Sequence, residues 1–184
     1  MGELKPSSWY DAAFREAPYT GGVEGNPFEQ LWREMARRVP PGVSIVELGC
    51  GPGHLASLIA PDATYYIGVD WSREAVVAAR RRLCLIPGAA IWREDLDAAG
   101  AALIPTAGFY IACEVLEHLQ NDLALIGLIP KGRTILASLP KRDSESHVRH
   151  FPTSADVTER YSALIEFSEV VEFQDWWIVT GVRR

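Results

Sequence analysis

Short β-rich runs alternate with helical segments through most of the chain, and this alternation limits the possible folds more than any other feature. Apolar runs rich in β-branched and aromatic residues predict five strands, at 43–48, 64–70, 89–95, 108–114 and 133–140. Between some of them lie segments of helical period and composition, at 54–60, 72–83 and 116–128. Strands and helices that alternate at this spacing predict βαβ units and a parallel sheet.

The last part of the chain departs from this alternation. A helix is predicted from Thr153 to Tyr161, with Thr153 and Asp156 at capping-box spacing. The strand-like runs 163–173 and 176–184 follow, with only two residues between them. Such a short connection cannot be a parallel crossover, so these strands should pair antiparallel. The predicted fold class is α/β, a seven-stranded mixed sheet with an antiparallel C-terminal hairpin and helices on both faces.

The segment ahead of the first strand carries its own signals. Asn26 and Pro27 suit the start of a helix, with Glu29 as the box partner. Residues 1–25 contain aromatic side chains that either cover a ligand cleft or pack on the sheet edge. We expect residues 1–184 to form a single domain.

Within that domain, residues 1–42 are expected to form an N-terminal helical cap and residues 43–184 the ligand-binding core. The chain has 184 residues, of which 48% are hydrophobic, and this suffices for one sizeable core. A net charge of −6 disfavours a protein that coats nucleic acid, because phosphate binding needs clustered Lys and Arg. The short run Arg80 to Arg82 is expected on a solvated helix face.

The cysteines bear on location. Cys50, Cys84 and Cys113 are widely spaced and odd in number, which fits neither a zinc pattern nor a disulfide framework. We therefore expect the protein to reside in a reducing compartment. No apolar run reaches membrane-span length, and the N-terminus has no apolar signal core. The predicted location is cytoplasmic.

The motif E-L-G-C-G-P-G-H, residues 47–54, links the first predicted strand to the first predicted helix. Gly49, Gly51 and Gly53 let the backbone pass close to a ligand, and helix N-terminal amides face the same place. Asp70 ends the second strand about twenty residues on, where its carboxylate can accept both hydroxyls of a ribose. The motif therefore predicts a nucleoside site.

Glu47 argues against a dinucleotide in that site. The glycine spacing is G-x-G-x-G, not G-x-G-x-x-G, and a carboxylate beside a pyrophosphate would be repelled. Either Glu47 faces a ligand with a cationic amino-acid end, or it holds the loop by hydrogen bonds. An NAD-type dehydrogenase is disfavoured by the spacing and by the lack of a catalytic Tyr/Lys pattern.

The motif C-E-V-L-E-H-L, residues 113–119, places Glu114, Glu117 and His118 among core-like residues. If a helix began at Glu114, the three side chains would share one face. They would lie at the carboxyl end of the strands, where open α/β sheets bind ligands. Further histidines follow the fifth strand, at 147 and 150.

In order along residues 43–140, V-E-L-G-C-G-P-G-H, I-G-V-D-W-S, E-D-L and C-E-V-L-E-H-L resemble class I S-adenosylmethionine-dependent methyltransferases. The resemblance implies a Rossmann-like fold and S-adenosylmethionine as the cofactor. It implies cofactor contacts from Glu47, Gly49, Cys50, Gly51, Gly53, Asp70, Trp71, Asp95, Leu96, Cys113 and Glu114.

The resemblance also implies individual roles. The loop glycines wrap the amino-acid part of the cofactor, with Glu47 beneath them and Cys113 nearby. Asp70 holds the ribose and Trp71 lies against the adenine. Asp95 reaches the adenine amine, with Leu96 supplying a backbone amide and Glu94 as the competitor for the role of Asp95.

Two methyltransferase groups share the E-x-x-E-H element and a later histidine, namely the ubiquinone-pathway O-methyltransferases and the small-RNA 3′-terminal 2′-O-methyltransferases. Both bind a divalent cation there. In the first group a histidine stands four residues before a phenylalanine, which here selects His147, with Phe151. The resemblance implies a divalent metal such as Mg at Glu114, Glu117, His118 and His147, where it would polarise an acceptor hydroxyl.

Two other roles stay open for these residues. His118 or His147 can act without metal as a general base. Alternatively, Glu117 and His118 only hydrogen-bond the turn. The sequence does not decide among the three.

The expected activity is methyl transfer to an oxygen or nitrogen of a small-molecule acceptor. A sulfonium carbon is already electrophilic, so transfer needs an acceptor held in line at contact distance. Only residues 1–25 and 141–160 are left to cover the acceptor. Arg142, Arg149 and Arg160 either attract an acidic acceptor or are solvated.

Two alternatives remain from the sequence. One is a non-catalytic S-adenosylmethionine-binding regulatory module. The other is a metal-dependent RNA 2′-O-methyltransferase, disfavoured because the chain is acidic and lacks that group's longer histidine-rich element. The sequence predicts no membrane span, no nucleic-acid partner and no particular oligomeric state.

Overall fold

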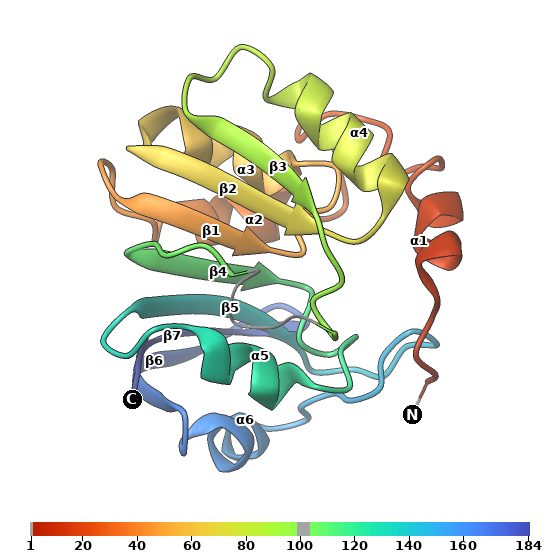
Figure 1. Cartoon of the computed structure of the whole chain (residues 1–184). Coiled ribbons are helices and arrows are strands. Elements are labelled where there is room, and N and C mark those ends of the chain that lie inside the picture. Colours follow the sequence, from red (N-terminus) through yellow and green to blue (C-terminus); the bar gives the residue numbers. More distant parts are fainter. Residues whose placement is uncertain (1, 99–103) are drawn as a thin grey trace.

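A computed structural model describes residues 2–98 and 104–184, and it centres on one seven-stranded sheet of order β3-β2-β1-β4-β5-β7-β6 (Figure 1). The strands are β1 (Ser44–Leu48), β2 (Tyr65–Asp70), β3 (Ala89–Arg93), β4 (Phe109–Cys113), β5 (Thr134–Pro140), β6 (Ile165–Phe173) and β7 (Trp176–Arg183). The first five are parallel, and β7 is antiparallel to both β5 and β6. The predicted Rossmann-like mixed sheet with an antiparallel hairpin is confirmed.

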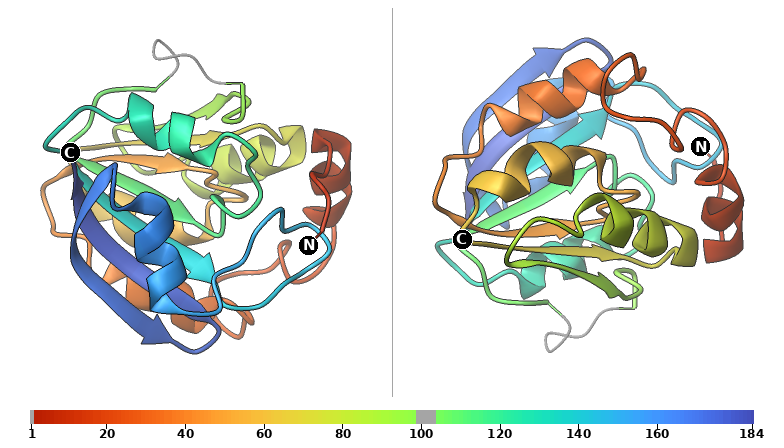
Figure 2. Two further views of the ribbon diagram at one scale, coloured as in Figure 1. Left: turned by 90° about the horizontal axis from the view of Figure 1, so that it is seen from below. Right: turned by 90° about the horizontal axis from the view of Figure 1, so that it is seen from above.

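Helices cover both faces of the sheet (Figure 2). They are α2 (Glu29–Ala36), α3 (His54–Ile59), α4 (Arg73–Arg82), α5 (Asp122–Leu128) and α6 (Ser154–Tyr161), with a 3-10 turn η1 (Ala60–Asp62). Helix α1 (Ser7–Ala13) lies instead at the carboxyl ends of the parallel strands. Leu31 of α2, Leu55 of α3 and Val76 of α4 belong to one buried apolar cluster. Leu125 of α5 and Val157 of α6 belong to the other. Among the described residues, no helix is both long and apolar enough to cross a membrane.

Local capping signals set several helix starts. The Ser72 hydroxyl accepts the amide of Ala75 at 3.2 Å and caps α4. Thr153 and Asp156 form the predicted capping box of α6. The helix predicted from Asn26 begins later, at Glu29, because the Asn26 side chain accepts the Phe28 amide at 3.0 Å and makes a turn.

The helix predicted over 116–128 is wrong in its first half, because α5 begins only at Asp122. Glu114 has a φ of 57°, in the left-handed region that a right-handed helix does not contain. A turn follows, in which the His118 amide donates to the Val115 carbonyl at 3.0 Å. The three polar side chains of this segment therefore do not share a helix face.

The N-terminal segment lies beside the loop that follows β5, at the carboxyl ends of the parallel strands (Figures 1 and 2). The Gly2 amide donates to the His147 carbonyl at 2.8 Å, and the Glu3 amide to the Glu145 carbonyl at 3.1 Å. The Ser72 hydroxyl, at the start of α4, donates to the Asp11 carboxylate of α1 at 2.6 Å. The segment is thus tied down on two sides of this end of the sheet.

Candidate active site

A cavity of about 500 Å³ opens at the carboxyl ends of the parallel strands. Most residues that the sequence analysis singled out line it: Glu47, Gly49, Cys50, Gly51, Asp70, Trp71, Asp95, Leu96, Cys113, Glu114, His118 and His147. Gly53, at the start of α3, packs against α4 instead. Glu117 is fully buried beside the two histidines. The fold therefore gathers four separate sequence motifs around one cavity.

The loop after β1 needs glycine at its first position. Gly49 has a φ of 70°, and a Cβ there would lie 2.4 Å from the Val115 side chain. Gly51, with a φ of 51°, directs its amide to the Asp70 Oδ2 atom at 2.8 Å. The loop is thereby fastened to the tip of β2.

Asp70 is buried and accepts a second hydrogen bond, from the Ser72 amide to Oδ1 at 2.9 Å. Burial raises the pKa of this carboxyl to about 6, although the amides of Ser72 and Gly51 oppose the rise. The side chain therefore holds the loop in place and still borders the cavity.

Glu47 lies beneath the loop, buried at 2% exposure. Its Oε2 atom accepts the Tyr66 hydroxyl at 2.6 Å, so its partner is a side chain of β2 and not a loop amide. Burial raises the pKa of Glu47 to about 8. A cation in the cavity would compensate this carboxylate.

The segment after β3 supplies the far wall. Asp95 is exposed and borders the cavity, and its Oδ1 atom accepts the Asp97 amide at 2.9 Å. Its competitor Glu94 is not among the lining residues of the described chain. Asp97 also lines the cavity and was missed, because the E-D-L pattern ends before it. Its carboxylate accepts the Asn121 amide at 2.7 Å.

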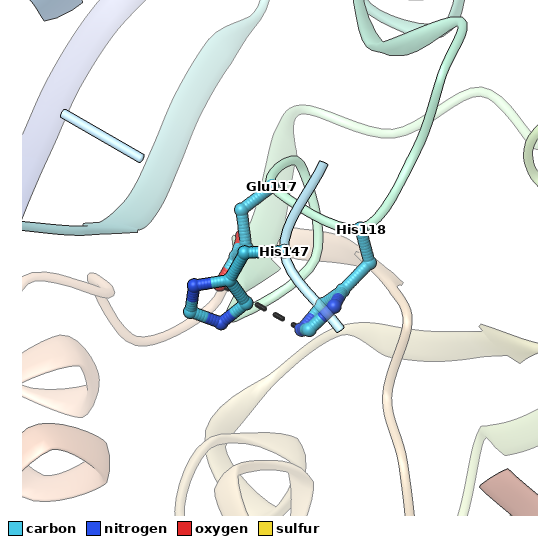
Figure 3. A group of neighbouring side chains, drawn as sticks. All are labelled: Glu117, His118 and His147. Carbon is cyan, nitrogen blue, oxygen red and sulfur yellow. Dashed lines mark ion pairs between the residues drawn. The ribbon is translucent and has the colours of Figure 1, made fainter. Parts of the chain in front are cut away.

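Glu117, His118 and His147 converge, and their potential ligand atoms all lie within 4.8 Å of one another (Figure 3). Glu117 Oε1 and His118 Nε2 lie 3.9 Å apart. Within the described chain neither Glu117 carboxylate oxygen has a hydrogen-bond partner. Of the four predicted metal ligands, Glu114 lies outside this group and bonds the Ser138 hydroxyl.

Backbone carbonyls fix both imidazoles. His118 Nδ1 lies 2.9 Å from the Ser146 carbonyl oxygen, and His147 Nδ1 lies 3.2 Å from that of Arg142. A carbonyl only accepts, so each Nδ1 carries the hydrogen and each Nε2 presents a lone pair. Burial lowers the pKa of both histidines, which favours the neutral form. Burial also raises the pKa of Glu117 to about 8.

This donor set fits a divalent cation by type. Imidazole Nε2 atoms and a carboxylate are common metal ligands, and each imidazole donates its other N–H to a backbone carbonyl, as metal-bound histidines usually do. The predicted choice of His147 over His150 agrees with the geometry, because His150 instead lies 3.8 Å from Asp143.

Aromatic side chains of the N-terminal segment cover the cavity: Trp9, Tyr10, Phe14 and Tyr19. The sequence left open whether this segment covers a cleft or packs on the sheet edge, and in the structure it covers the cleft. The Tyr10 ring lies 5.8 Å from that of His118 and 5.7 Å from that of Trp71, centroid to centroid. Its hydroxyl is buried and has no hydrogen-bond partner among the described residues.

Two side chains anchor this cover at one carbonyl. His54 Nε2 lies 3.0 Å from the Gly21 oxygen, and Arg82 Nη2 donates to the same oxygen at 2.9 Å. Arg80 and Arg81 of the same run are exposed, as predicted for a solvated helix face. Arg82 is the exception, because it binds the cover.

The three arginines considered for an acidic acceptor are committed elsewhere. Arg160 binds Asp122 through two nitrogens, at 2.8 and 2.6 Å. Arg149 donates to carbonyls of the 116–120 turn, and Arg142 pairs with Asp175 at 3.0 Å. None of them lines the cavity.

Comparison with known proteins places this arrangement in a family. Residues 46–128 match the family model described as methyltransferase domain, which takes in both the glycine loop and the 113–119 motif. The match covers 83 of the 184 residues, and over that part the chain is similar to this methyltransferase family. A curated relative of this chain is the ribosomal protein L11 methyltransferase of Paraburkholderia xenovorans, 27% identical over 96% of this chain. The chain spans only 58% of that relative's length.

Solved structures share the fold of this chain. N-methyltransferase NodS of Bradyrhizobium japonicum WM9, in complex with S-adenosylhomocysteine, aligns with a TM-score of 0.76 at 15% identity, over 96% of this chain and 97% of NodS. Magnesium protoporphyrin IX methyltransferase (ChlM) of Synechocystis PCC 6803, with bound S-adenosylmethionine, aligns with a TM-score of 0.69 at 16% identity, over all of both chains. At such identities the likeness establishes the fold alone.

Proposed function

We propose that this methyltransferase transfers the methyl group of S-adenosylmethionine to an oxygen or nitrogen of a small-molecule acceptor. One observation carries the proposal: a single cavity is bordered by the glycine loop tied to Asp70 and, opposite, by the neutral imidazoles of His118 and His147. A cofactor and an acceptor held in this space would meet inside a water-poor cover. Such positioning is what methyl transfer from a sulfonium requires.

The cofactor roles follow the order of the motifs. Gly49, Cys50 and Gly51 wrap the amino-acid end above Glu47, whose carboxylate compensates the ammonium. Asp70 accepts the ribose hydroxyls. Two of the solved structures with this fold hold S-adenosylhomocysteine or S-adenosylmethionine, which supports the cofactor.

The remaining contacts lie at the adenine end and at the amino-acid end of the cofactor. Trp71 and Asp95 flank the adenine, and Leu96 offers its amide. Cys113 and Glu114 border the amino-acid end, at the tip of β4. Gly53 acts indirectly, by letting α3 begin close to α4.

The acceptor side needs a proton acceptor when the attacking atom must lose a proton. The Nε2 lone pairs of His118 and His147 supply it. The cover of residues 1–25 leaves room for a small acceptor only, in a domain that we propose to act as one unit over residues 1–184. The protein substrate named for the L11 relative makes a protein acceptor the competing class. A cytoplasmic location stays a prediction.

Calorimetry with S-adenosylhomocysteine tests the cofactor site. We expect S-adenosylhomocysteine to bind the wild type, and its affinity to fall at least tenfold in Asp70→Ala. The substitution removes both the anchor of the glycine loop and the acceptor of the ribose hydroxyls. Asp175→Ala, which removes an exposed carboxylate of the β6–β7 turn, is the control and should bind normally. Absence of binding to the wild type at millimolar ligand would end the proposal. Tight binding with no turnover on any acceptor would favour the regulatory-module alternative.

A second candidate is metal-assisted O-methylation. Its support is the fully buried Glu117 carboxylate, without hydrogen-bond partners in the described chain, beside two lone-pair nitrogens. Glu117, His118 and His147 would hold a divalent ion such as Mg, which would polarise an acceptor hydroxyl when bound. Titration of the protein with Mg or Mn, compared with His147→Ala, measures the site directly. Unchanged methyl transfer in excess EDTA would remove this candidate.

A further inference from the structure

The charges around the cavity have one sign. Among the described residues that line it, none is lysine or arginine. Its charged lining residues are all carboxylic acids: Glu47, Asp70, Asp95, Asp97, Glu114 and Glu145. Burial raises the pKa of Glu47 and of Glu114 to about 8, so these two are largely neutral at pH 7, but the lining still offers no protein cation to an anionic acceptor. An acceptor with a carboxylate or phosphate would meet repulsion here with no cation to offset it.

The acceptor side also offers hydrogen-bond acceptors without matching donors. His118 and His147 present Nε2 lone pairs, because their Nδ1 hydrogens are committed to backbone carbonyls. Glu117, at 0% exposure, adds two oxygens that no described residue satisfies. Figure 3 shows the three side chains gathered together, with a dashed line for the Glu117–His118 pair. A compact group with several N–H donors would satisfy all three side chains at once.

The spacing of these atoms admits an ammonium. An ammonium nitrogen with acceptors at about 2.9 Å in tetrahedral directions spaces them about 4.7 Å apart. Zinc ligands at about 2.0–2.1 Å lie only about 3.4 Å apart in the same geometry. The observed atoms lie within 4.8 Å of one another, and the Glu117–His118 pair is 3.9 Å apart. The 3.9 Å pair lies between the two spacings, and 4.8 Å is only an upper bound for the other pairs, so the cluster admits an ammonium as well as a metal ion.

An aromatic wall faces the cluster. Tyr10 contacts His118 edge to face, and Trp9, Phe14 and Tyr19 extend the wall across the cover. Aromatic faces attract cations as well as other rings. Because the cofactor takes a large share of the 500 Å³, the space left suits a molecule of one or two rings.

We infer that the acceptor is a small aromatic-ring amine, its nitrogen held at the Nε2 atoms of His118 and His147 in front of Glu117, and its ring against Tyr10. This inference deepens the proposed function and rests on it. It competes with the metal-assisted candidate, because one cluster cannot hold both cations.

The transfer balances with the groups present. An amine that enters protonated first gives a proton to the Nε2 lone pair of His118, which relays it to solvent. The freed nitrogen lone pair then attacks the methyl carbon of S-adenosylmethionine. The carbon–sulfur bond breaks, its electron pair stays on sulfur, and S-adenosylhomocysteine forms. The new methylammonium carries the positive charge that the sulfonium has lost.

The test compares matched ligands on protein saturated with S-adenosylhomocysteine. Tryptamine and indole-3-acetate share a ring and differ in the sign of the side-chain charge, and tryptophol is the neutral analogue. Calorimetry should give tryptamine at least tenfold tighter binding than indole-3-acetate, with tryptophol between them. Methyl transfer to tryptamine, followed by mass spectrometry, should yield the N-methyl product.

Two variants locate the selectivity. Glu117→Gln keeps the size of the side chain and should bring the tryptamine to indole-3-acetate ratio to within about threefold, since a glutamine cannot ionise beside a bound ammonium. Glu166→Gln makes the same charge change on β6, at the opposite end of the sheet, and should keep the full ratio. Binding of S-adenosylhomocysteine to each variant confirms that it is folded.

The possible results distinguish a failure of the proposed function from a failure of the amine inference. If the wild type does not bind S-adenosylhomocysteine, the proposed function itself fails. If it does, equal or tighter binding of indole-3-acetate overturns the amine inference alone, as does an unchanged ratio in Glu117→Gln. A preference for indole-3-acetate that EDTA abolishes would overturn it in favour of a metal in the cluster.

Discussion

Glu114 and Ser138 are joined by two hydrogen bonds: the Glu114 amide donates to Ser138 Oγ at 2.9 Å, and that hydroxyl donates back to Glu114 Oε1 at 3.1 Å. Ser138, on β5, is fully buried. Together the bonds hold Glu114 at a φ of 57°, a backbone conformation that costs a residue with a side chain about 1–3 kcal/mol. The bond to β5 thus turns the chain sharply after β4 and aims Glu114 into the cavity.

Glu114→Gly should therefore stabilise the fold and impair ligand binding. Glycine adopts a positive φ without strain, so the free energy of unfolding should rise by about 1 kcal/mol. Binding of S-adenosylhomocysteine should weaken, because the cavity loses one wall. Urea unfolding and calorimetry measure the two effects.

Gln174→Gly is the matched control for Glu114→Gly. Gln174 has a φ of 52° in the exposed β6–β7 turn, away from the cavity lining. This substitution should give a similar gain in stability and leave ligand binding unchanged. If Glu114→Gly lowered stability and Gln174→Gly did not, strain at position 114 would be the wrong explanation.

The fold was largely predictable because its signals are local. Strand runs, the glycine loop and the capping box of Thr153 and Asp156 each lie within one stretch of sequence. The pairing of Asp70 with the loop follows from them, since neighbouring parallel strands end at one edge. A four-motif cavity was therefore expected and is present.

The turn after β4 was not predictable in the same way. V-L-E-H-L fits a helix by composition, and the contact that prevents the helix comes from Ser138, 24 residues away. The group formed by Glu117, His118 and His147 thus has three of the four predicted metal ligands, without Glu114, and a different geometry. Tyr10 carries no local signal at all, because its place over the cavity depends on tertiary packing of α1.

Burial of Glu47 should make the free protein less stable at alkaline pH. Its folded-state pKa, about 8, lies above its usual value of 4.5, so its stabilising share is complete below about pH 4.5 and is lost as pH rises through 8. Thermal unfolding followed from pH 6 to pH 9 should show a falling Tm. Glu47→Gln, which can still accept the Tyr66 hydroxyl, should reduce that fall.

The control for Glu47→Gln is Glu166→Gln, at an exposed position of β6, which should keep the wild-type fall in Tm. Saturating S-adenosylhomocysteine should also reduce the fall in the wild type, because its ammonium would compensate the ionised Glu47. A parallel pH profile for wild type and Glu47→Gln would contradict the assignment of the effect to this carboxylate.

Arg149 should position the turn that carries Glu117 and His118. Its guanidinium donates to the Leu116 and Leu119 carbonyls and lies 3.4 Å from buried Asp122. Arg149→Met should lower the free energy of unfolding by about 1–3 kcal/mol, because buried acceptors lose their donor. It should also lower kcat, while the KM for S-adenosylmethionine changes less, since the glycine loop is untouched.

Arg142→Met is the matched arginine control, because the ion pair that the Arg142 side chain makes among the described residues is with exposed Asp175 on the surface. Its effect on stability should stay within about 0.5 kcal/mol, as for other exposed ion pairs. Urea unfolding and steady-state kinetics on both variants make the comparison. Equal losses in the two would show that the turn does not depend on Arg149.

Gly2 should be needed to close the cover. A Cβ at this position would lie 2.3 Å from the Glu145 carbonyl oxygen, so Gly2→Ala should part the N-terminal segment from the loop that carries His147. Cofactor product should then escape faster, by roughly tenfold in the dissociation rate of S-adenosylhomocysteine, because lid opening often limits release. Stopped-flow displacement measures this rate. Gly22→Ala, where a Cβ meets nothing within 4 Å, should leave it unchanged, and an unaltered rate in Gly2→Ala would mean that this contact does not retain the ligand.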